Sequence, residues 1–71
     1  MTILKQLRLE NNWTQQYVAN IVGITKSAYS NIENQNRSPS LKVAVQLQRL
    51  FGLPIEKLLE IKNSNSAPSK V

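Results

Sequence analysis

Apolar side chains recur every three or four positions along most of this chain, and no segment shows the sustained alternation of a half-buried strand. In the first segment, for example, Leu4 and Leu7 lie one turn apart on the same side. The pattern predicts five helices, over residues 3–11, from Thr14 to a break at Gly23, and over residues 25–34, 40–51 and 55–61. We therefore expect an all-α protein.

The expected helix ends carry residues that suit them. Thr14 and Thr25 each precede a segment of apolar periodicity, where a hydroxyl can accept a hydrogen bond from a free amide of the first turn. Trp13 comes just before Thr14 and can pack on Val18 as a hydrophobic staple. Gly52 follows the fourth helix and can supply the left-handed conformation that ends it. The expected boundaries therefore rest on capping chemistry as well as on periodicity.

The fourth helix is expected to bury an apolar stripe. That stripe consists of Leu41, Ala44, Leu47, Leu50 and Phe51. The short fifth helix presents Ile55, Leu58 and Leu59. Residues 62–71 are small and polar without apolar periodicity. We therefore expect one domain over residues 1–61, followed by a flexible C-terminal tail over residues 62–71.

The amino-acid composition restricts the chemistry. The 71 residues include no cysteine, histidine or aspartate, and the four glutamates are scattered. A nucleophile paired with a base, a metal-ligand cluster and a phosphate-binding glycine loop are all missing, so we expect no enzyme, no metal and no cofactor. A net charge of +5 and a pI near 10.0 favour an anionic partner, either nucleic acid or a membrane surface. Since no apolar run approaches the roughly 20 residues that span a bilayer, we expect a cytoplasmic protein.

The second and third helices are joined by a very short turn. Such a pair can cross closely only if a small side chain lies at the crossing, which Ala19 provides, and if the turn tolerates a positive φ, which Gly23 does. At about 100° per residue, Ala28, Tyr29 and Ile32 share the inner side of the third helix. The opposite side carries Lys26, Ser27, Ser30, Asn31 and Asn34.

This outer side combines short polar side chains with one lysine and has no carboxylate. In the major groove of DNA, lysine can reach guanine, asparagine can pair with adenine, and serine can contact either base. The composition is therefore typical of a helix that lies in the major groove. The nearest acid, Glu33, falls outside this side and is better placed to meet Arg8 of the first helix.

The segment around the short turn resembles the helix-turn-helix of the phage repressor and Cro group, also called the xenobiotic-response-element (XRE) family. The pattern that carries the resemblance consists of Gln15, Val18, Ala19, Val22, Gly23, Ile24, Tyr29, Ile32 and Glu33. The flanking stretches LRLENNWTQ and NIENQNRSPSLKVAVQLQRLFGLPIEKLLE are also similar to the family, so the resemblance covers residues 2–60. It implies the five-helix repressor-like domain, in which the second helix braces the DNA backbone and the third reads bases.

By this resemblance, the base-reading residues are Lys26, Ser27, Ser30 and Asn31. The implied contacts to DNA phosphates come from Gln15, Asn34, Asn36 and Arg37. Each assignment also has a plainer interpretation: Lys26 and Arg37 as solvated charges, Gln15 as a good helix former, and the serines as small spacers.

Arg8 and Glu33 match a pair that buttresses the motif in the family, although an ordinary surface pair would contribute under about 1 kcal/mol. Two positions depart from the family pattern. Tyr29 stands where Val or Ile is usual, so its hydroxyl needs water or another partner. Gln35 stands where Gly is frequent, which leaves the geometry of the following loop open.

Two functions remain open. The first is a sequence-specific DNA-binding transcriptional regulator, a repressor that binds a pseudo-palindromic operator in double-stranded DNA as a homodimer, because a single recognition helix covers too few bases to be selective. The dimer interface is expected within residues 51–61, with apolar Leu53, Ile55, Leu59 and Ile61. The second is a protein-interaction module of the same fold, such as an antitoxin, that uses Leu9 or the set Ile55, Leu59 and Ile61 to bind a foreign partner.

Overall fold

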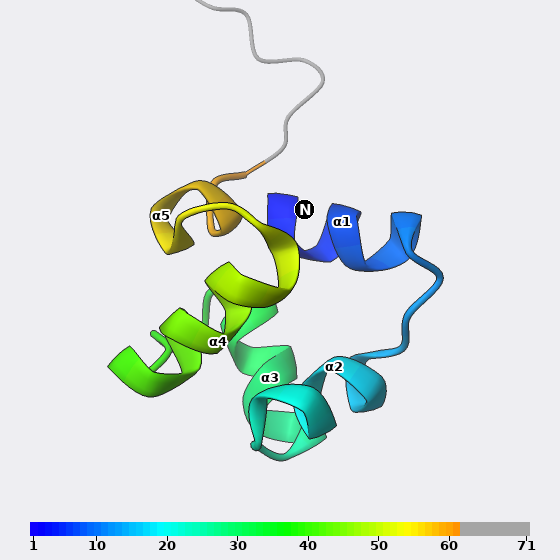
Figure 1. Ribbon diagram of the computed structural model, residues 1–71, viewed down its shortest axis with the longest axis vertical. Helices are drawn as coiled ribbons and strands as arrows, with labels where there is room; N and C mark the ends of the chain where they lie inside the picture. Colours follow the sequence, from blue (N-terminus) through cyan, green and yellow to red (C-terminus); the bar gives the residue numbers. More distant parts are fainter. Residues whose placement is uncertain (62–71) are drawn as a thin grey trace, which may run out of the picture.

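Five helices form the part of the chain that the computed structural model describes, residues 1–61 (Figure 1). They are α1 (Ile3–Glu10), α2 (Gln15–Val22), α3 (Lys26–Glu33), α4 (Leu41–Phe51) and α5 (Ile55–Leu58). The predicted all-α fold is confirmed, and the first four helices lie within one residue of their expected bounds. None of these helices is long and apolar enough to cross a lipid bilayer. The expected tail, residues 62–71, lies outside the described residues.

Hydroxyl caps explain where the first four helices begin. The side-chain oxygens of Thr2, Thr14, Thr25 and Ser40 each accept a hydrogen bond from the backbone amide three residues further on, at 3.2, 3.0, 3.1 and 3.3 Å. Each cap satisfies an amide that the helix itself leaves unpaired, and its replacement by alanine typically costs about 1 kcal/mol. The predicted caps Thr14 and Thr25 are therefore confirmed.

α2 and α3 meet at the corner expected from the short turn between them. Ala19 is completely buried, and its carbonyl oxygen accepts hydrogen bonds from the amides of Gly23 and Ile24. Gly23 has a φ of 79°, in the left-handed region that only glycine enters without strain. This corner sets the direction in which α3 leaves α2, and hence which side of α3 faces solvent.

Each of the five helices contributes at least one completely buried apolar side chain to the core. These residues include Leu4, Val18, Tyr29, Leu47 and Leu58, each 0% exposed. Trp13 packs against this cluster, and its ring centroid lies 5.4 Å from that of Tyr17 and 5.7 Å from that of Phe51. Trp13 thereby ties the connection between α1 and α2 to the end of α4.

The predicted apolar stripe of α4 is wrong at its first position. Leu41 is 83% exposed, whereas Val43, which the stripe omitted, is only 7% exposed. At about 100° per residue, Leu41 lies roughly 120° around the helix from the completely buried Leu47, which leaves Leu41 outside the part of α4 that contacts the core. The four remaining positions do lie on the core side; they are Ala44, Leu47, Leu50 and Phe51.

α5 ends at Leu58 rather than at the expected residue 61. Beyond it the chain forms an isolated antiparallel bridge between Ile61 and Thr2, and the Ile3 amide donates to the carbonyl oxygen of Glu60 at 2.9 Å. Figure 1 shows the end of α5 beside the start of α1. Residues 59–61 lie outside the helix because Glu60 and Ile61 pair with Ile3 and Thr2 at the other end of the described chain.

The burial difference between Leu58 and Leu41 predicts opposite outcomes for the same substitution. Leu58→Ala leaves a cavity beneath α5 and should lower the free energy of unfolding by about 2–5 kcal/mol. Leu41→Ala removes a side chain that is 83% exposed and should change it by less than about 0.5 kcal/mol. Urea denaturation followed by circular dichroism measures both. If Leu41→Ala lowered the free energy of unfolding as much as Leu58→Ala, Leu41 would have to be buried, which would contradict this orientation of α4.

Candidate nucleic-acid interface

The side of α3 that was expected to face outward does so. Lys26 and Ser27 are exposed, and Ser30 and Asn31 are half-buried. Asn34 follows the helix, is exposed, and donates from its side-chain nitrogen to the Ser30 hydroxyl oxygen at 3.4 Å. The structure therefore gathers the proposed base-reading residues on a single helical face that carries amides, hydroxyls and one ammonium group.

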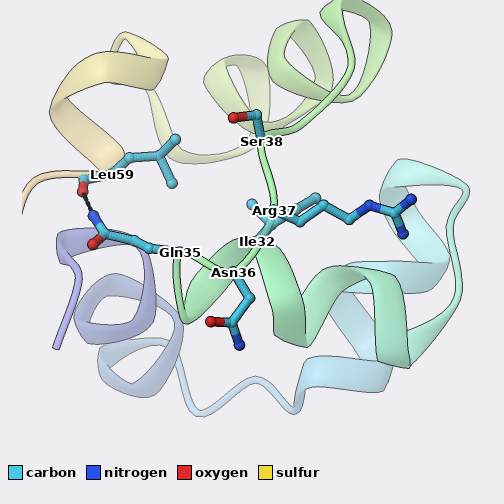
Figure 2. A pocket seen from close by; sticks show the side chains of 6 residues that line it. All are labelled: Ile32, Gln35, Asn36, Arg37, Ser38 and Leu59. Carbon is cyan, nitrogen blue, oxygen red and sulfur yellow. Dashed lines mark hydrogen bonds between the residues drawn. The ribbon is translucent and has the colours of Figure 1, made fainter.

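The loop after α3 leaves helical geometry at Gln35, whose φ is 62°. This left-handed conformation costs a non-glycine residue about 1–2 kcal/mol, which explains why glycine suits the position. The Gln35 side-chain nitrogen donates to the carbonyl oxygen of Leu59 at 2.5 Å, across an open pocket of about 350 Å³ (Figure 2). The backbone amide of Asn36 donates to the backbone carbonyl oxygen of Asn31 at 2.8 Å. Hydrogen bonds thus tie the loop both to Leu59 and to the last turn of α3. The exposed side chains of Asn36 and Arg37 extend away from Leu59 (Figure 2).

A shallow hollow of about 650 Å³ lies where the end of α1 meets the starts of α2 and α3. Gln15 and Lys26, which come from different helices, both line it. Asn12 and Gln16 line it as well, and reasoning from the sequence did not include either as a contact residue. Gln16 could have been found as the second polar residue in the first turn of α2. Asn12 could not, because its place depends on a backbone φ of 60°.

The Glu33 carboxylate accepts four side-chain hydrogen bonds at the junction of three helices. Arg8 donates from Nε to Oε2 at 2.7 Å and from Nη2 to Oε1 at 3.2 Å. The Tyr29 hydroxyl donates to Oε2 at 2.7 Å, and Gln15 donates from Nε2 to Oε1 at 3.0 Å. Arg8 also donates from Nη1 to the carbonyl oxygen of Trp13 at 2.8 Å. This network therefore links α1, α2, α3 and the connection between the first two.

Arg8 and Glu33 do not form the ordinary surface pair that was considered, because their side chains are only 8% and 0% exposed. Burial by itself would raise the pKa of the Glu33 carboxyl, but the hydrogen bonds from Arg8, Tyr29 and Gln15 outweigh burial and lower that pKa below 4.5. The hydrogen bond to Glu33 raises the pKa of Arg8, against the effect of burial. Burial and the bond to an anion both raise the pKa of the Tyr29 hydroxyl. In neutral solution the network therefore holds a carboxylate, a guanidinium and an un-ionised phenol.

The charge of the surface around α3 follows from this burial. Residues 11–55 contain a single carboxylate, Glu33, and it is buried and paired. The exposed cations of the same stretch are Lys26, Arg37, Lys42 and Arg49. Within residues 1–61, no three side chains of the metal-ligating types His, Cys, Asp and Glu come together. The surface around α3 therefore offers an anionic partner cations and neutral donors.

Comparison with known proteins gives concordant matches. A model of the helix-turn-helix family matches residues 4–58. The chain is 38% identical over 96% of its length to the HTH-type transcriptional regulator AnsR of Bacillus subtilis, and 32% identical over 87% of its length to the cryptic phage CTXphi transcriptional repressor RstR of Vibrio cholerae. It spans 60% and 56% of those two relatives. An uncharacterized HTH-type transcriptional regulator of Methanocaldococcus jannaschii is 34% identical over 78% of this chain and 83% of its own length.

Loss of the Glu33 charge should destabilise the domain and flatten its response to acid. Glu33→Gln leaves the buried Arg8 without a counter-ion, so the free energy of unfolding at neutral pH should fall by about 3–5 kcal/mol. A carboxyl whose pKa is lowered by folding stabilises the native state above its unfolded pKa, and this contribution disappears as the pH falls through the folded pKa. Wild-type protein should therefore lose stability below about pH 4.5, and Glu33→Gln should lose less over the same range.

Urea denaturation as a function of pH measures both effects, and Glu56→Gln serves as the control because Glu56 is exposed. If Glu33→Gln and Glu56→Gln gave the same acid response, the network would make no contribution to stability.

Proposed function

Because this chain belongs to the helix-turn-helix family, whose model matches residues 4–58, we propose that it is a sequence-specific DNA-binding transcriptional regulator whose DNA-binding domain is residues 1–61. We further propose that it is a repressor that binds a pseudo-palindromic operator as a homodimer. The similarity to a protein named as a phage transcriptional repressor supports repression. Proteins of this family are DNA-binding regulators, which in general are not enzymes.

The exposed side of α3 carries this proposal. Lys26 at its start can reach guanine O6 or N7, and Asn31 five residues later can pair with adenine. Glu33, the only carboxylate in residues 11–55, is withdrawn into the core, so this side of α3 itself carries no charge that would repel the DNA phosphates. The residues assigned to reading bases are Lys26, Ser27, Ser30 and Asn31.

Phosphate contacts are assigned to the two ends of α3. At its start, the hollow combines the Gln15 amide with the Lys26 ammonium group. Beyond its end, the exposed loop offers a guanidinium and two amides, from Arg37, Asn34 and Asn36. Contacts at both ends would fix the depth and register of α3 in the groove, because phosphate contacts position a protein on DNA while base contacts provide selectivity.

A homodimer is proposed because one copy of α3 covers too few bases for selective binding. We assign the interface to residues 51–61. Ile61 is 54% exposed there, while Leu53, Ile55 and Leu59 are partly buried against the core and each retain some accessible surface. An interface on this side would leave the outer face of α3 free for DNA in both copies.

A second candidate function is a protein-interaction module, such as an antitoxin. The observation that favours it is the exposure of large apolar side chains outside residues 51–61: Leu41 is 83% exposed, Leu9 and Tyr17 are each 47% exposed, and Ile21 is 43% exposed. Apolar side chains this accessible can serve as anchors for a protein partner. For a protein with this function DNA would be a secondary partner, and a module that binds protein alone would enrich no duplex in a selection for binding.

Selection of bound duplexes from a random pool tests the DNA-binding proposal. The enriched sequence should be an inverted repeat whose half-site centres lie about 34 Å apart, one helical turn of DNA. Asn31→Ala should weaken binding to that duplex by about 1–3 kcal/mol and relax preference at one base pair. Arg37→Ala should weaken all duplexes alike and reduce the salt slope by about one. Equal losses on selected and random DNA for Asn31→Ala would remove it from the base-reading set.

The dimer proposal predicts different effects when a charged residue replaces each of two exposed aliphatic residues. Ile61→Glu should weaken both self-association and operator affinity, because it places a carboxylate in the proposed interface. Leu41→Glu, at a position that is 83% exposed at the start of α4, should leave the dimer intact. Analytical ultracentrifugation with and without the selected duplex measures both variants. A monomer from Leu41→Glu and a dimer from Ile61→Glu would move the interface to α4.

A further inference from the structure

The hydroxyl of Tyr29 has no part in the DNA contacts assigned above. Its ring is completely buried in the core, and phenylalanine would fill the same space. The hydroxyl nonetheless donates to Glu33 Oε2 at 2.7 Å, at the centre of the network. A buried hydroxyl needs a partner once it is present, but packing of the ring does not require the hydroxyl. The hydroxyl therefore acts through its hydrogen bond to Glu33 rather than through packing.

Tyr29 completes the hydrogen bonding of the Glu33 carboxylate. A carboxylate has about four lone-pair sites, and Arg8 occupies one on each oxygen. Tyr29 takes the second site on Oε2, and Gln15 takes the second site on Oε1. The hydroxyl and the amide therefore hold opposite oxygens of the same group. Without the hydroxyl, Oε2 keeps a vacant buried site, and the carboxylate can shift away from the orientation that Gln15 requires.

Gln15 connects this buried group to the surface. It is half-buried, and it lines the hollow together with Gln16 and Lys26. Its amide nitrogen carries two hydrogens, of which the bond to Glu33 uses one. The second hydrogen is available to an acceptor in the hollow. The position of Glu33 thus determines how the Gln15 amide is held before any partner arrives.

We propose that Tyr29 is a positioning residue for DNA: its hydroxyl fixes Glu33, and Glu33 holds the Gln15 amide ready to donate to a backbone phosphate in the hollow. This inference rests on the proposed function. An amide held in place before binding loses less rotamer entropy on contact with phosphate, so the preorganised state binds more tightly. Because the phosphate contact does not depend on sequence, the effect is the same on any duplex.

A double-mutant cycle on a short random-sequence duplex, followed by fluorescence anisotropy, tests this role. Tyr29→Phe should weaken binding roughly three- to tenfold, the loss expected for one hydrogen bond. In a Gln15→Ala background, Tyr29→Phe should cause no further loss, because the amide that it positions is gone. Tyr17→Phe is the matched control, since it removes a hydroxyl from a tyrosine that is 47% exposed and does not line the hollow.

Two readouts separate positioning from a general loss of structure. The slope of log affinity against log salt concentration should be the same for Tyr29→Phe and wild type, because the slope counts cationic contacts and glutamine is neutral. In NMR spectra of free wild-type protein, the two Gln15 side-chain amide protons should be separated by more than those of a solvent-exposed glutamine, because one of them is hydrogen-bonded to the Glu33 carboxylate. This second measurement needs no variant and therefore does not depend on how well Tyr29→Phe folds.

The positioning role would be overturned if Tyr29→Phe caused the same loss of affinity in the wild-type and Gln15→Ala backgrounds, or no loss in either. It would also be overturned if the Gln15 amide protons gave signals at the positions of free glutamine. In each of these cases the proposal that the protein binds DNA would stand. Wild-type protein that binds neither random nor selected duplexes would overturn the proposed function, and this inference with it.

Discussion

A buried negative charge organises this domain. The Glu33 carboxylate can leave water only if donors replace its hydration, because an unpaired buried ion costs several kcal/mol. Arg8 supplies two donors from α1, and Gln15 supplies one from α2. Arg8 also holds the carbonyl oxygen of Trp13, which lies in the connection between those helices. This ion pair and the groups around it therefore help to fix the position of α1 relative to the α2–α3 corner.

The same ion pair shapes the electrostatics of the surface. Glu33 is the only carboxylate in residues 11–55, and its burial leaves the exposed side of α3 without a negative charge. Lys26 at the start of α3 and Arg37 beyond its end remain exposed. A glutamate on that side would repel a polyanion, whereas a buried and paired one stabilises the fold. One residue thus contributes to stability and also keeps the surface suitable for DNA.

Predictions from the sequence were least accurate where contacts between distant segments overrode a local pattern. Residues 59–61 continue the apolar pattern of α5, yet they leave the helix to pair with the start of the chain. The error at Leu41 has a local cause instead, because the helical rotation alone places its side chain roughly 120° from that of Leu47. The partner of the Tyr29 hydroxyl could have been found, because Glu33 follows it by four residues and is therefore its neighbour on the helix.

By itself, the sequence determined the bounds of the first four helices, the corner at Gly23, and the types of side chain on the outer side of α3. Those features depend on residues within one or two turns of each other, so periodicity and capping chemistry suffice to predict them. Only the tertiary structure decided that Arg8 and Glu33 are buried and that Gln15 meets Lys26 at one hollow. The strength of an ion pair depends on how far surrounding elements exclude water, and that exclusion arises only when helices distant in the sequence pack together.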